Sequence, residues 1–202
     1  MIKKIFAYFF IIYVSTISGS FANQSNYLKI GDINAAVTVK VFSSLTCPHC
    51  ANFHKKIYDN LKREYIDTKK VSLEHRSFPL DLAALNAEKI LRSVKDKEKS
   101  FKLLGQIYKK QNQWAVGSDI SIINKSLKKI GLDFGLKEET IDKYLKDEKI
   151  QDQILNERIT AQKDYKIEST PTIYINAKKY EGEHKYDEFK KEIEKILKKY
   201  EI

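Results

Sequence analysis

The most constraining feature of this sequence is a pair of cysteines spaced C-x-x-C at the end of a strand-like run. The motif Cys47-Pro48-His49-Cys50 holds the only two cysteines of the 202 residues and directly follows the run Val37–Ser44. Two thiols at this spacing can close a small disulfide ring and reopen it. A helix N-terminus supplies partial positive charge and free N–H groups, which favour a thiolate at Cys47, and Pro48 is well tolerated in a first helical turn. The pattern predicts a redox-active dithiol that opens a helix.

The same spacing also occurs in zinc sites and in structural bridges. A structural zinc site normally has four ligands, and the chain has no second cysteine pair. The remaining candidates are the four histidines of the chain, His49, His54, His75 and His184. We therefore expect no metal, and no separate cofactor, because the dithiol is itself the redox group.

The first 22 residues have the three parts of a secretory signal. Lys3 and Lys4 precede the apolar run from 5 to 17, and Ser20-Phe21-Ala22 resembles a signal peptidase site. The apolar run is shorter than the roughly 20 residues that a spanning helix prefers, which argues against a permanent anchor. We expect cleavage after Ala22 and export of residues 23–202 to an oxidising bacterial periplasm, with membrane contact only through the signal peptide.

The strongly basic composition does not by itself indicate a nucleic-acid partner. The formal charge is +10, and cleavage after Ala22 would lower it to +8. The lysines occur as pairs mixed with acidic residues, as at Lys128-Lys129 and Lys190-Lys191, and not as a basic block with interleaved aromatics. This pattern favours a solvated, lysine-rich surface and no binding to nucleic acid.

The pattern of apolar residues predicts an α/β order of elements. Strands are expected at 37–42 and 71–78, joined by a helix carrying the stripe Phe53, Ile57 and Leu61, which implies a parallel pair. Residues 23–34 are interpreted as a polar entry segment with a turn at Gly31-Asp32. Residues 82–165 look helical throughout, with breaks at 117–119 and 131–135. A strand at 172–176, a short partner strand and a closing helix at 186–200 complete the chain.

This order and its motifs resemble the DsbA-like thiol:disulfide oxidoreductases of the thioredoxin-fold superfamily. Four stretches carry the resemblance: Ser44-Leu-Thr-Cys-Pro-His-Cys-Ala-Asn-Phe-His54, Arg76-Ser-Phe-Pro-Leu-Asp81, Gln111-Asn-Gln-Trp114 and Thr170-Pro171-Thr172. The resemblance covers the chain after residue 22. It implies a thioredoxin fold with a helical insertion at about 82–165, and a single polypeptide acting as a monomer.

The resemblance also implies roles for the site residues. Cys47, the better exposed sulfur, would be attacked by client thiols, and Cys50 would be its buried partner. Thr170 and Pro171 would bind an extended client, with the Thr170–Pro171 bond in the cis form, although a trans proline at the start of a strand is the alternative. Pro48 and His49 would tune the dithiol toward oxidation, unless His49 is simply an exposed helix residue.

Two positions depart from the family pattern. Val41 stands six residues before Cys47, where family members often carry a buried acid that accepts a proton. Glu168 lies two residues before Thr170, either near the dithiol, where it would raise the pKa of Cys47, or in solvent, which we favour. Trp114, Phe101, Leu104 and Tyr108 have helical spacing and are predicted to be core, and His75 and His184 are predicted to be structural.

The leading hypothesis is a periplasmic enzyme that introduces disulfide bonds into exported proteins. Its partners would be unfolded or folding exported clients and a membrane oxidase resembling DsbB. A disulfide isomerase or reductase is the alternative within enzymes. A non-enzymatic chaperone that holds clients in the same groove is the alternative from another class.

Overall fold

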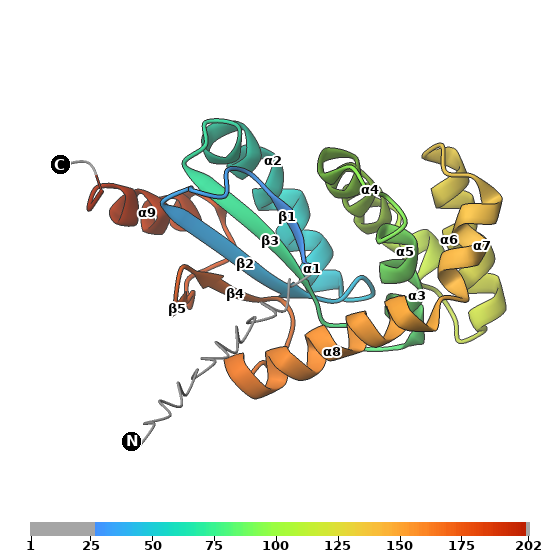
Figure 1. Ribbon diagram of the computed structural model, residues 1–202. Coiled ribbons are helices and arrows are strands. Elements are labelled where there is room, and N and C mark those ends of the chain that lie inside the picture. The colour runs from blue at the N-terminus through green and yellow to red at the C-terminus, as the bar shows by residue number, and fades with distance from the viewer. Residues whose placement is uncertain (1–26, 201–202) are drawn as a thin grey trace, which may run out of the picture.

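A mixed five-stranded sheet forms the frame of the structure, a computed structural model that describes residues 27–200 (Figure 1). The strands are β1 (Leu28–Ile30), β2 (Val37–Ser43), β3 (Val71–Ser77), β4 (Thr172–Ile175) and β5 (Lys178–Lys179). Their spatial order is β1-β3-β2-β4-β5. β2 and β3 are parallel, as the sequence predicted, and the other pairs are antiparallel.

Alternation along β2 separates the two faces of the sheet. Val37, Val39 and Val41 are buried in the larger core together with the helix that follows the dithiol and the closing helix α9 (Tyr186–Leu197). Phe42 points to the opposite face, where it packs with Ala161 and Ile167 in a smaller cluster. Helices on both faces explain why β3 is buried at every position, although its sequence alternates apolar and polar residues.

One continuous helical run follows the dithiol and contains two π-helical segments. It comprises α1 (Pro48–Phe53), η1 (His54–Tyr58), α2 (Asp59–Leu61) and η2 (Lys62–Ile66). Its buried stripe repeats every four residues, and on a helix of 3.6 residues per turn such a repeat drifts by roughly 40° each time. The wider π turns offset this drift, so that Phe53, Ile57 and Leu61 all stay in the core.

Residues 82–165 are mainly helical, as the sequence predicted, and this stretch divides into six helices. They are α3 (Leu82–Leu91), α4 (Lys97–Lys109), α5 (Gln111–Trp114), α6 (Ile120–Asp133), α7 (Glu138–Leu145) and α8 (Glu148–Tyr165). The predicted breaks contain Gly117 and Gly135, both with positive φ. Further breaks follow α3 and α7, where Asp96 and Asp147 cap the next helix by accepting backbone N–H bonds. Without Gly or Pro to mark them, these two breaks were not predicted.

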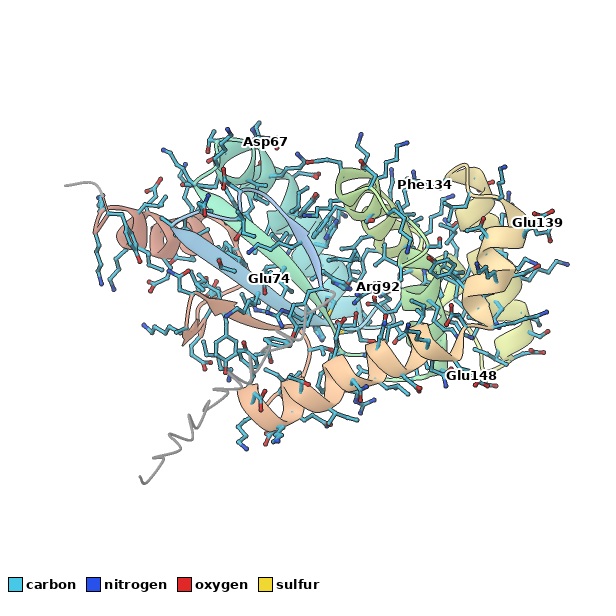
Figure 2. The ribbon with its side chains drawn as sticks, in the orientation of Figure 1. Asp67, Glu74, Arg92, Phe134, Glu139 and Glu148 are labelled. Atoms are coloured by element: carbon cyan, nitrogen blue, oxygen red, sulfur yellow. The ribbon has the colours of Figure 1, made fainter. Side chains whose placement is uncertain are left out.

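The insertion is joined to the sheet by apolar packing and by hydrogen bonds between Ser77 of β3 and a buried ion pair of the insertion. Trp114, Phe101, Leu104 and Tyr108 are all buried in the larger core, which confirms the prediction for them. A guanidinium nitrogen of Arg92, which follows α3, donates to both carboxylate oxygens of Glu157 on α8, at 2.8 and 2.9 Å. Figure 2 shows Arg92 at this junction between the sheet and α8. α8 thereby returns the chain to the sheet just before β4.

The arrangement is a thioredoxin fold with added helices, which confirms the predicted fold class. One prediction for the entry segment was wrong, because Leu28–Ile30 is a strand that pairs with β3. A three-residue edge strand flanked by polar residues carries too little alternation to be recognised. The predicted signal peptide lies outside the described residues. Within residues 27–200, no helix is long and apolar enough to cross a membrane.

Truncation of a side chain in the buried stripe Phe53, Ile57 and Leu61 should destabilise the fold. Ile57 is fully buried, so Ile57→Ala is expected to lower the free energy of unfolding by about 2–5 kcal/mol. Ile159→Ala, at a residue that is 57% exposed, is the matched control and should change it by no more than about 0.5 kcal/mol. Urea unfolding followed by circular dichroism measures both. Equal effects of the two substitutions would contradict the assigned packing.

Candidate active site

The two cysteines lie at the first turn of α1, next to the end of β2. Cys47 is the N-cap residue with extended backbone angles, and its carbonyl accepts the N–H groups of Cys50 and Ala51 at 3.1 and 3.2 Å. Both thiols are free. Cys47 is 6% exposed and Cys50 is 2% exposed, whereas Pro48 and His49 lie on the surface. The predicted order of exposure is thus confirmed, although Cys47 itself is also largely covered.

The loop before β4 lies against Cys47. The Thr170–Pro171 peptide bond is cis, as predicted from the resemblance. In its thiol form, Cys47 donates a hydrogen bond from Sγ to the carbonyl oxygen of Thr170 at 3.3 Å. β4 pairs with β2, the strand that leads into the dithiol, and this pairing brings Thr170 and Pro171 to the sulfurs from more than 120 residues away.

The environment separates the pKa values of the two thiols. The pKa of Cys47 is lowered from 9.0 to about 5, chiefly by a hydrogen bond from the Cys50 thiol and against an opposing effect of burial. The Thr170 hydroxyl contributes to this lowering, and so do the backbone N–H groups of Cys50 and His49, as expected for a helix N-terminus. Burial raises the pKa of Cys50 far above its ordinary value. Cys47 is therefore a thiolate at neutral pH, and Cys50 is a thiol.

Side chains from the insertion and from the residue just before it hold the loop that carries Cys47. The amide of Gln111 donates to the carbonyls of Leu45 and Cys47, at 2.7 and 3.1 Å. The Thr46 hydroxyl donates to the carboxylate of Asp81 at 2.8 Å. Gln111 and Asp81 appeared in the sequence only as parts of family-like stretches, and nothing in their spacing showed that they would meet the dithiol loop.

An open groove of about 670 Å³ begins at Cys47. Its lining is mostly apolar and includes exposed Leu80 and Leu82, 48% and 54% exposed, together with Ile120 from the insertion. A groove of this kind can accept apolar side chains of an extended polypeptide beside the reactive sulfur.

The two departures from the family pattern occupy different environments. Val41 is buried and lines a small cavity next to Cys50. Glu168 is exposed, as favoured from the sequence. His49 affects the Cys47 thiolate through its backbone N–H, and the role predicted for its imidazole stays a prediction. Over residues 27–200, no three His, Cys, Asp or Glu side chains group closely enough to hold a metal ion.

A helix-capping thiolate, a buried thiol and a cis-proline loop on this sheet define a dithiol–disulfide redox protein of the thioredoxin type. A family model described as thioredoxin matches residues 23–195. Disulfide bond formation protein D of Bacillus subtilis is 30% identical over 176 residues, covering 84% of this chain and 76% of that protein. The crystal structure of alpha-DsbA1 of Wolbachia pipientis superposes with a TM-score of 0.79 at 27% identity, covering 86% and 92% of the two chains.

The chain therefore belongs to the thioredoxin family, within the DsbA-like thiol:disulfide oxidoreductases. A putative protein-disulfide oxidoreductase of Rickettsia bellii is 29% identical over 164 residues, covering 81% of this chain. This chain spans 62% of the length of that relative, less than two thirds.

Removal of the Thr170 hydroxyl should weaken the thiolate. Thr170→Val is expected to raise the pKa of Cys47 by about one unit, or 1.4 kcal/mol, because it removes a buried hydroxyl that has no other hydrogen-bond partner within residues 27–200 and can donate to the charged sulfur. The ultraviolet absorbance of the thiolate, followed against pH, measures this. Thr172→Val is the matched control, since the Thr172 hydroxyl donates to the Ser169 carbonyl and not to a sulfur. A pKa that does not move in Thr170→Val would contradict the role of its hydroxyl.

Proposed function

We propose that this protein is a dithiol oxidase that introduces disulfide bonds into exported proteins. The single observation that carries the proposal is the separation of the two thiols, a thiolate at Cys47 and a thiol buried beneath it at Cys50. The names of the Bacillus and Rickettsia relatives support the same chemistry.

The reaction proceeds by two thiol–disulfide exchanges. A client thiolate attacks Sγ of Cys47 in the oxidised protein, the Cys47–Cys50 bond breaks, and Cys50 leaves with the electron pair and takes up a proton. A second client thiolate then attacks the client sulfur of the mixed disulfide, which forms the client disulfide and releases Cys47 as a thiolate. Because the pKa of Cys47 is low, it is a good leaving group in this second step.

The client lies in the groove as an extended segment. Thr170 and Pro171 present backbone at one side of Cys47 for pairing with the client, while the apolar lining from Leu80 to Ile123 receives its side chains. Because the recognition is mostly by backbone and apolar contact, the enzyme accepts many unfolded sequences.

The direction of the reaction follows from the thiolate. Any interaction that stabilises the Cys47 thiolate stabilises the reduced protein, and so makes its disulfide a stronger oxidant. DsbA itself combines a strongly acidic thiol with an oxidising couple, and this chain shares the direction of that effect. A reductase or isomerase would need a more stable disulfide, and a client-holding chaperone would need no exchange at all.

The proposed location is the bacterial periplasm. The three-part signal at residues 1–22 supports export, and an oxidising compartment suits a protein that must be recycled to the disulfide. A membrane oxidase resembling DsbB is the proposed recycling partner.

Reduced protein should be more stable to urea than oxidised protein at neutral pH. At pH 7, which is two units above the Cys47 pKa of about 5, the thiolate contributes about 2.7 kcal/mol to the stability of the folded reduced form. Closing a four-residue loop stabilises the oxidised form by about 2 kcal/mol in the chain-entropy formula. A depressed pKa stabilises most above its ordinary value of 9.0 and loses its effect as pH falls, so the order should reverse at about pH 6.5, where the thiolate contributes only about 2 kcal/mol.

Equilibration with a glutathione buffer complements the urea experiment. The disulfide should be reduced by glutathione more readily than an ordinary structural disulfide. If it resists reduction as a cytosolic thioredoxin disulfide does, the protein is a reductase and the oxidase proposal is wrong. A protein that exchanges no thiols with glutathione would support the chaperone instead.

N-terminal sequencing tests the location. Protein recovered from the periplasmic fraction of its bacterial cell should begin at Asn23. Recovery of the intact Met1 form from the cytosolic fraction would contradict export.

A further inference from the structure

A cavity of about 30 Å³ lies beside the buried sulfur of Cys50. Its lining includes Val41, Ser43, His75 and Tyr108, and its volume exceeds the roughly 10–15 Å³ that a cavity needs to hold one water molecule. The Tyr108 hydroxyl is buried and has no hydrogen-bond partner among the described residues. A buried polar group next to a water-sized space is the usual setting of an internal water.

A chain of buried polar side chains starts at this cavity and leads away from Cys50. The Ser43 hydroxyl lies 3.1 Å from Nδ1 of His75, and Nε2 of His75 lies 2.7 Å from a carboxylate oxygen of Glu88. The three residues are 1%, 3% and 0% exposed. In the sheet register, His75 is the parallel partner of Val41, so the imidazole stands one strand away from the position where an acid is missing.

The Glu88 carboxylate determines which nitrogen of the His75 imidazole faces the cavity side of the chain as an acceptor. Burial acts to raise the pKa of Glu88, but the charges and hydrogen bonds of His75, Arg92 and Ser77 outweigh it and hold that pKa below its ordinary value. An ionised carboxylate only accepts hydrogen bonds, so Nε2 of His75 is the donor in that contact. Nδ1 is left facing the Ser43 hydroxyl, where it accepts when the imidazole is neutral and donates when it is protonated.

The other titratable groups around His75 do not have this arrangement. His54 also lines the cavity, but burial lowers its pKa to about 3, and its ring lies between those of Tyr58 and Tyr108 without a carboxylate. Glu74 is engaged by Lys29 and Arg76. Glu157, behind Glu88, is paired with Arg92. The remaining ionisable groups that line the cavity are Cys50 and the hydroxyls of Tyr58 and Tyr108, and burial raises the pKa of all three.

We propose that Ser43, His75 and Glu88 form a proton relay that serves Cys50 through one water in this cavity. The inference rests on the proposed thiol–disulfide exchange. When Cys50 leaves as a thiolate, the water protonates it, Ser43 reprotonates the water, and Nδ1 of His75 reprotonates Ser43. In the reverse step the same proton leaves Cys50 for His75, the Cys50 thiolate attacks Sγ of Cys47, the Cys47–Cys50 bond forms, and the mixed disulfide releases its thiolate. Ser43 and His75 carry the proton and act on Cys50 through the water, and Glu88 is a positioning residue that holds the ring and stabilises its charge.

Rapid-mixing oxidation of the reduced full-length protein by glutathione disulfide separates the two steps. At low concentrations of glutathione disulfide, the rate of oxidation depends on attack by the Cys47 thiolate, and the slope of this rate against the concentration reports that step. At high concentrations of glutathione disulfide, the rate reaches a plateau that is set by attack of Cys50 on the mixed disulfide. The Cys50 thiol must lose its proton for this attack. General base assistance is typically worth about 10²–10⁴-fold, so His75→Gln should lower the plateau at least about tenfold at mildly acidic pH while lowering the slope far less.

The pH profile gives a readout that a purely structural role would not change. With the relay the plateau should depend only weakly on pH, because the imidazole and not hydroxide takes the proton, whereas in His75→Gln it should rise about tenfold per pH unit with the hydroxide concentration. Val41→Glu placed in the His75→Gln background should restore the plateau, since residue 41 lines the same cavity as Cys50.

Milder substitutions keep the test valid if His75→Gln does not fold. Ser43→Ala and Tyr108→Phe remove single hydroxyls at the cavity, and each should lower the plateau. Ser72→Ala is the matched control, because Ser72 is a fully buried serine on β3 whose hydroxyl contacts Thr38 and not the cavity. An unchanged plateau in folded Ser43→Ala and Tyr108→Phe, or an equal loss in Ser72→Ala, would overturn the relay. If the oxidation rate of the wild-type protein did not rise at all with the concentration of glutathione disulfide, the proposed function would be overturned, and the relay with it.

Discussion

The site depends on the unequal environments of two sulfurs that are only three residues apart. Cys47 caps a helix, so backbone N–H groups and the Cys50 thiol converge on it and favour negative charge. Cys50 lies one helical turn further in, where burial favours the neutral thiol. The asymmetry is a consequence of helix geometry, because the first turn of a helix offers donors that have no partner within the helix.

The fold brings distant segments to this helix start from three sides. β4 pairs with β2 and delivers Thr170 beside the reactive sulfur. Gln111 from the insertion and Asp81 before α3 hold the loop between β2 and α1. The insertion therefore does more than enlarge the core, since it fixes the backbone of Cys47 and supplies one wall of the groove.

The sequence predicted the parts of this structure that have local causes. The order of strands and helices, the dithiol at a helix start and the burial of Trp114 follow from spacing and periodicity. The cis bond at Pro171 was expected only because of the family resemblance. Contacts between distant segments were not predictable in this way: the pairing of β1 with β3, the Gln111 bonds and the hydrogen bond between His75 and Glu88 depend on tertiary packing. His75 was predicted to be structural from its place in a strand, and its buried carboxylate partner is what changes that interpretation.

Val41 links the electrostatics of the dithiol to its proton chemistry. A carboxylate at this position would lie against the sulfurs, and its charge would oppose the Cys47 thiolate. An apolar residue there removes that repulsion and so favours the reduced form, yet it also removes the nearest group that could exchange a proton with Cys50. Glu88 is held one layer away, behind His75 and with Arg92 near its carboxylate, so its charge is largely compensated before it reaches the dithiol. Because the imidazole of His75 stands between this acid and the dithiol, the site keeps both a stable Cys47 thiolate and a route for the proton of Cys50.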